Sequence, residues 1–140
     1  MHPEAGPNDD EDAGKAEAGG KPTTQCDTLP EKQAVDPILS PEGLRLRVPD
    51  YVADADAADP RISPIFGDLA GLPPLLIQVG SHEILLSDAL RLAVRAARDD
   101  VAVTLEVTPG VPHVFQGFAA MLDEGDAALA RASAFLDEHF

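Results

Sequence analysis

The sequence predicts an α/β fold built from one strand–helix–strand unit and a terminal helix. Three observations predict it: a nearly continuous apolar run at Leu75–Val79, an amphipathic segment at residues 85–100, and a run rich in β-branched residues at Val101–Val107. Strand, helix and strand follow one another within about 33 residues, as in a βαβ unit with parallel strands. Two strands make a poor independent domain, so we expect them to form the edge of a larger sheet.

The first 25 residues are predicted to be a disordered acidic tail. They contain no Leu, Ile, Val, Phe or Tyr and are rich in Asp, Glu, Gly, Pro and Ala. Such a segment buries too little apolar surface to offset the entropy lost on ordering. We therefore expect a tail at residues 1–25, a linker at 26–34 and a partial α/β domain at 35–140.

A helix is predicted to begin after Ser40, which precedes Pro41 and Glu42. Serine is a good N-cap, and proline is favoured at the first helical position. Pro49 is expected to end or kink this helix within two turns. The segment Asp54–Pro64 is rich in Asp and Pro and is predicted to be a loop.

The first strand is the run that follows Pro74 and ends at Gly80. An apolar run without alternation is typical of a strand that is buried on both faces. In the next segment, apolar residues recur at helical spacing, so one face of the helix is expected to be buried. These residues are Leu86, Leu90, Ala93, Val94 and Ala97.

The second strand is predicted at Val101–Val107 because of its β-branched residues. After a Pro-Gly turn and His113, a final helix is expected over roughly Asp123–His139. Its predicted apolar face consists of Leu122, Leu129, Ala132 and Leu136.

Charge and composition exclude several classes of function. The formal net charge is −15, of which −4 falls on residues 1–25 and −11 on the rest. Bulk electrostatics therefore do not favour binding to nucleic acid or to an anionic membrane. Cys26 is the only cysteine, so no intrachain disulfide can form. No signal peptide and no apolar run of about 20 residues is present, and we expect a soluble, cytoplasmic chain.

Two polar residues occupy the positions where α/β proteins carry function. Glu83 follows the first predicted strand and His113 follows the second. Because adjacent parallel strands bring their carboxyl ends together, these side chains are expected to meet. A carboxylate on one imidazole nitrogen fixes the tautomer and stabilises the imidazolium, as in a catalytic triad. Taken singly, the histidine is equally well explained as a structural loop residue and the glutamate as a helix N-terminal charge.

From about Val35 to Phe140 the chain resembles the C-terminal part of the hormone-sensitive-lipase-type esterases of the α/β-hydrolase superfamily (α/β-hydrolase fold-3). The landmarks, in order, are "DPILSPEGL", "DPRISPIFGDLAGLPPLLIQVGSHEILLSDALRLA" and "VTPGVPHVFQGF". The resemblance implies that Glu83 is the catalytic acid and His113 the general base of a carboxylic-ester hydrolase. It implies no cofactor. No metal is expected either, because His82, Glu83 and Asp88 do not have a spacing that would hold zinc on one face. Val114 and Phe115 are expected to pack beneath the loop.

The same family uses a serine in a G-x-S-x-G elbow and a Gly-rich oxyanion loop, and neither motif occurs in these 140 residues. Of the five serines, Ser81 lies nearest to Glu83, but adjacent side chains diverge and the family gives this position no nucleophilic role. Cys26 lies in a stretch without apolar periodicity. No nucleophile is therefore assigned, and the chain alone is expected to be inactive.

Three interpretations remain open on the sequence. The first is the acid- and base-bearing part of an esterase that is inactive alone, either a truncated gene product or one half of a split enzyme whose other half supplies the serine. The second is a non-catalytic partner of a full-length relative, because the resemblance implies dimerisation through Val101–Val107 and the terminal helix. The third is a truncated remnant with an aggregation-prone edge at Leu75–Val79.

Overall fold

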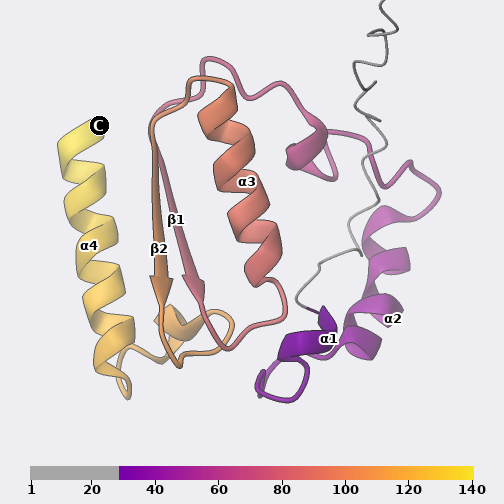
Figure 1. Ribbon diagram of the computed structural model, residues 1–140, viewed down its shortest axis with the longest axis horizontal. Coiled ribbons are helices and arrows are strands. Elements are labelled where there is room, and N and C mark those ends of the chain that lie inside the picture. The colour runs from indigo at the N-terminus through magenta and orange to yellow at the C-terminus, as the bar shows by residue number, and fades with distance from the viewer. Residues whose placement is uncertain (1–28) are drawn as a thin grey trace, which may run out of the picture.

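The structure, a computed structural model, describes residues 29–140, and the predicted acidic tail at 1–25 lies outside them. A parallel two-stranded sheet lies between two long helices within these residues (Figure 1). The strands are β1, Leu75–Gly80, and β2, Val103–Thr108, paired in register from Leu75 opposite Val103 to Gly80 opposite Thr108. The predicted βαβ unit is confirmed, although β2 begins two residues later than expected.

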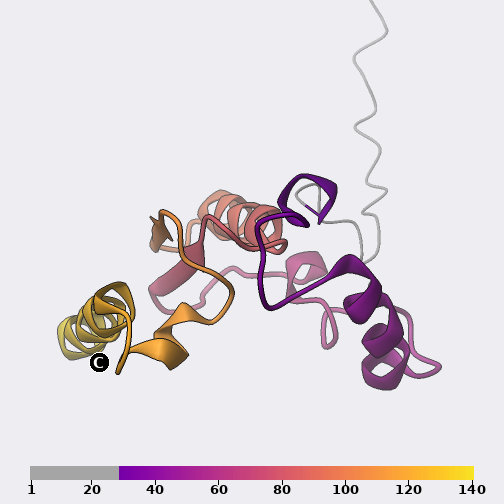
Figure 2. The same cartoon turned by 90° about the horizontal axis from the view of Figure 1, so that it is seen from below.

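The helices α3 and α4 cover opposite faces of this sheet (Figure 2). Helix α3, Leu86–Arg98, connects the two strands, and α4, Asp123–His139, ends the chain. Between β2 and α4 lies the short 3₁₀ helix η2, Phe115–Phe118. Both long helices were predicted with nearly these bounds.

Between residue 29 and β1, the described part of the chain contains two further helices and one short 3₁₀ helix. These are α1, Leu29–Lys32, inside the predicted linker, α2, Pro41–Val52, and η1, Pro64–Phe66, at the end of the predicted loop. The Ser40 side chain accepts the N–H of Gly43 at 3.0 Å, which confirms the predicted N-cap. Among the helices of residues 29–140, none has the length and apolarity that crossing a bilayer requires.

Of the two effects predicted for Pro49, an end or a kink of the helix, the end does not occur, because α2 continues to Val52. Proline in a helix removes the hydrogen bond to the carbonyl four residues earlier, here that of Arg45. Arg45 is exposed, so water can hydrate this carbonyl. The lost bond therefore falls on the solvent side of the helix, where its cost is lowest.

The buried face of α3 matches the predicted one only in part: Ala93 is buried as predicted, but other predicted positions are exposed. Leu90 and Val94 are 39% and 53% exposed, whereas Ala96 is fully buried against Leu69 and Val101. Alanines at the contact allow the helix backbone to approach the strands closely. Two apolar stripes with helical spacing run along this helix, and periodicity alone does not tell which one faces the sheet.

The predicted face of α4 is also only partly correct: Leu122 and Ala132 are half-buried, but the two other predicted residues are exposed. Leu129 and Leu136 are 48% and 56% exposed, and the buried positions are Gly125 and Ala128. Gly125 lies so close to η2 that an added Cβ would stand 2.8 Å from the carbonyl oxygen of Phe115. Small residues thus form the contact, and the large apolar residues face outward.

The first strand is less buried than its apolar run predicts. Only Val79 and Gly80 are buried, and Leu75–Gln78 are half-buried. Within residues 29–140, β1 pairs with β2 alone, so its side chains are covered on two faces but not by a further strand. Burial is highest at the carboxyl end of β1, and Glu83 lies in the turn that follows this end.

Candidate active site

The structure brings Glu83 and His113 together at the carboxyl ends of the two strands. Glu83 lies in the turn between β1 and α3, and His113 lies between β2 and η2. The His113 Nδ1 atom is 3.1 Å from Glu83 Oε1. Residues 30 positions apart are thus joined by a hydrogen bond, as the parallel topology predicts.

The two side chains differ in their exposure to solvent. The Glu83 side chain is 6% exposed and that of His113 is 30% exposed. The second carboxylate oxygen, Oε2, accepts the backbone N–H of Gly80 at 2.9 Å, so both oxygens of Glu83 have a partner. A buried carboxylate held from two sides is a rigid acceptor for an imidazole N–H.

Gly80 permits the close approach of the two loops. An added Cβ at this position would lie 2.2 Å from the carbonyl oxygen of Val111 and 2.9 Å from that of Pro112. The same Val111 carbonyl accepts the N–H of His82 at 3.1 Å. The loop that carries His113 therefore rests directly on the end of β1, a role that sequence analysis did not assign to this glycine.

Ser81 has a structural contact at this site. Its hydroxyl oxygen accepts the backbone N–H of Gly110 at 2.8 Å, and its own N–H donates to the Thr108 carbonyl at 2.9 Å. Gly110 has a φ of +75°, which the Pro-Gly turn requires and which glycine adopts without strain. Ser81 thus fastens the turn that leads to His113.

The residues after His113 only partly behave as predicted. Phe115 is fully buried and packs with Val111 and Ala128, as expected. Val114, in contrast, is 54% exposed and has a φ of +53°, the left-handed region that β-branched residues rarely adopt. This backbone turn places Phe115 in the core and leaves Val114 in solvent beside His113, so the predicted packing of Val114 was wrong.

A network of polar side chains supports the loop from the α4 side of the sheet. Gln78 donates to Glu106 at 2.9 Å and to the Ala128 carbonyl at 2.8 Å, and it accepts from Gln116 in η2 at 3.2 Å. Arg131 in α4 holds both oxygens of Glu106 at 2.9 Å. Strands, η2 and α4 are thereby joined around the histidine loop.

A βαβ unit with an acid after one strand and a histidine after the next is the arrangement of an α/β hydrolase. The comparisons agree: a family model described as "alpha/beta hydrolase fold" matches residues 16–117. An esterase of Acinetobacter venetianus is 41% identical over 114 residues, which cover 81% of this chain and 38% of the relative. An acetyl-hydrolase of Streptomyces hygroscopicus is 42% identical over 105 residues, covering 75% and 35%.

Solved structures give the same result. An esterase/lipase from an uncultured bacterium superposes with a TM-score of 0.79 and 39% identity. An esterase of the bacterial hormone-sensitive lipase family superposes with a TM-score of 0.80 and 38% identity. Both matches cover 83% of this chain and 39% of the other. The chain belongs to the α/β-hydrolase family of hormone-sensitive-lipase-type ester hydrolases, and it spans about two fifths of the length of these relatives.

Proposed function

We propose that His113 and Glu83 are the general base and the orienting acid of carboxylic-ester hydrolysis by a Ser-His-acid triad. The observation that carries this proposal is the 3.1 Å contact between His113 Nδ1 and Glu83 Oε1. It fixes the Nδ1–H tautomer, so the free lone pair lies on Nε2 at the opposite side of the ring. The His113 side chain is 30% exposed, which is compatible with access of a reacting group to the ring.

In the proposed reaction, Nε2 takes the proton of a serine hydroxyl as the serine oxygen attacks the ester carbonyl. The imidazolium is stabilised by the Glu83 carboxylate and then protonates the leaving alcohol. Water repeats the sequence to release the acid and the free serine. Relatives named acetyl-hydrolase and ethyl acetate hydrolase support a small acyl ester as substrate.

We further propose that these 140 residues hydrolyse little by themselves. None of their five serines lies in a G-x-S-x-G elbow, and a Gly-rich oxyanion loop is also missing from the sequence. Loss of a triad serine lowers turnover by about 10⁶-fold, and the remaining rate depends on an intact oxyanion hole. A serine-bearing polypeptide would therefore have to complete the site.

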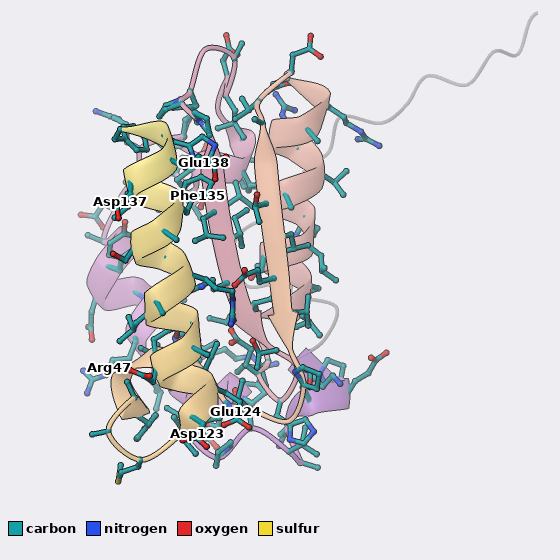
Figure 3. All side chains as sticks on the ribbon, turned by 90° about the vertical axis from the view of Figure 1, so that its left-hand side faces the viewer. Arg47, Asp123, Glu124, Phe135, Asp137 and Glu138 are labelled. Atoms are coloured by element: carbon teal, nitrogen blue, oxygen red, sulfur yellow. The ribbon has the colours of Figure 1, made fainter. Side chains whose placement is uncertain are left out.

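A second candidate function is association with another copy or with a relative through β2 and α4. The outward residues at α4 support it: Leu129, Leu136 and Phe140 are 48%, 56% and 77% exposed. Figure 3 shows α4 in front of the strands, with Asp123 and Glu124 at its start and Asp137 and Glu138 at its end. An exposed apolar stripe between charged ends is typical of a helix that packs in an interface.

Ester hydrolysis by the purified chain tests the first proposal. We expect no turnover of a short p-nitrophenyl ester by the chain alone. Turnover is expected after mixing with a relative's segment that carries the serine elbow, and His113→Ala should abolish it, whereas His139→Ala should not. Hydrolysis by the chain alone that disappears in His113→Ala would contradict the missing nucleophile. Turnover in the mixture that survives His113→Ala would contradict the role of this histidine.

Light scattering tests the second candidate function. A discrete dimer that dissociates in Leu129→Glu would support association through α4, whereas a monomer at high concentration would exclude it. Polydisperse aggregates that persist in this variant would instead favour a truncated remnant that associates through the open edge of β1.

A further inference from the structure

The Asp36 side chain makes a long-range contact to the turn that carries Glu83. Its Oδ2 accepts the backbone N–H of Ile84 at 3.0 Å, across 48 positions of sequence. Its Oδ1 accepts the N–H groups of Ile38 and Leu39, both at 2.9 Å. One carboxylate thus closes a local turn and also reaches the residue that directly follows the proposed catalytic acid.

The Glu83 turn is consequently held at two points. The carboxylate of Glu83 is fixed by the N–H of Gly80, and the next peptide N–H, that of Ile84, is fixed by Asp36. The Ile84 side chain is fully buried, so the turn cannot shift without moving a core residue. We propose that Asp36 is a positioning residue that keeps Glu83 aimed at His113, an inference that rests on the proposed roles of those two residues.

The geometry explains why such a support matters. Glutamate has three rotatable side-chain bonds, so a small rotation of the backbone at Glu83 or Ile84 displaces the carboxylate. The contact with His113 is already 3.1 Å, and a further displacement of about 0.5 Å takes it beyond hydrogen-bonding range. Hydrogen bonds to an ionised acceptor are stronger than neutral ones, and Asp36 supplies such an acceptor to the turn.

Substitution of Asp36 in the full chain separates positioning from simple folding. Asp36→Asn has one acceptor oxygen and cannot serve both the local turn and Ile84, and Asp36→Ala serves neither. Asp56→Asn is the matched control, because the Asp56 carboxylate accepts the N–H of Ala58 in a local turn of the same kind. Nitrogen NMR then reports the tautomer of His113, and amide exchange reports the protection of Ile84.

We expect the Asp36 variants to exchange the Ile84 amide about tenfold faster than the control. The ratio of Nδ1–H to Nε2–H tautomer at His113 should also fall several-fold, while the control matches the parent chain. An unchanged tautomer ratio in both Asp36 variants would overturn the proposal. Glu83→Gln tests the underlying pair: if it leaves the ratio unchanged as well, the proposed pairing itself fails, and Asp36 has nothing to position.

Discussion

Gly80→Ala adds one methyl group at the contact between β1 and the histidine loop. The new Cβ would stand 2.2 Å from the Val111 carbonyl oxygen and 2.9 Å from that of Pro112. Real Cβ atoms essentially never approach an oxygen closer than 3.0 Å, so the Val111 carbonyl must retreat by about 0.8 Å. Both obstacles are backbone atoms, and no side-chain rotation relieves the clash.

Two consequences follow from this displacement. The free energy of unfolding is expected to fall by about 2–4 kcal/mol, since overpacking costs about 1–3 kcal/mol and the bond from the His82 N–H to Val111 adds about 1 kcal/mol. The loop also carries His113 away from Glu83. The 3.1 Å contact then stretches, and the preference for the Nδ1–H tautomer should be lost.

Urea unfolding and nitrogen NMR of His113 measure the two effects. Gly117→Ala is the matched control, because an added Cβ there meets only Val114 Cγ1 at 3.9 Å, an ordinary van der Waals contact. The control should keep the parent stability within about 0.5 kcal/mol. A Gly80→Ala chain with parent stability and an unchanged His113 tautomer would refute the argument that this glycine sets the approach of the two loops.

Three further predictions concern other parts of the fold. Phe115→Ala should lower the free energy of unfolding by about 3–5 kcal/mol, because the Phe115 ring is fully buried. Urea unfolding measures this change, and a loss below about 1 kcal/mol would show that Phe115 is not a core residue. Asp100→Gly should raise this free energy by up to about 1 kcal/mol, because Asp100 has a φ of +58° at the end of α3; destabilisation would contradict this. Hydrogen bonds from Arg61 lower the pKa of Asp59 from 3.8 to about 2, so the stabilisation by this pair is present above pH 3.8 and is lost as the pH falls through 2. Arg61→Ala removes the side-chain bonds but keeps the backbone N–H of residue 61, so it should raise the pKa of Asp59, followed by carbon NMR, part of the way towards 3.8. An unchanged pKa would exclude the Arg61 side chain as a cause.

The end of α3 shows how a local rule and a tertiary contact combine. The N–H of Asp100 bonds the Ala97 carbonyl and that of Val101 bonds the Ala96 carbonyl, which is the Schellman arrangement. The side chain of Val101 then packs on Ala96. Sequence analysis extended the second strand back to Val101, because β-branched composition does not distinguish the last turn of a helix motif from the first residue of a strand.

The pairing of Glu83 with His113 was predictable because it follows from topology. Each residue stands just after a strand of one βαβ unit, and parallel pairing places both strand ends at the same edge. The residues that hold the pair were not predictable in this way. Asp36 accepts the N–H of Ile84 across 48 positions. Position 80 requires glycine because the Val111 carbonyl, 31 residues later, occupies the place of a Cβ.

The sequence by itself determined the order and type of the two strands and of α2, α3 and α4, the Ser40 cap and the meeting of the acid with the histidine. These features depend on patterns within a few residues or on the fixed geometry of a parallel unit. Only the tertiary structure decided which stripes of α3 and α4 face the sheet, since Ala96 and Ala128 are buried while larger residues remain exposed. Close packing selects the helix face whose shape fits the surface of the sheet. The periodicity of apolar residues within the helix carries no information about that surface.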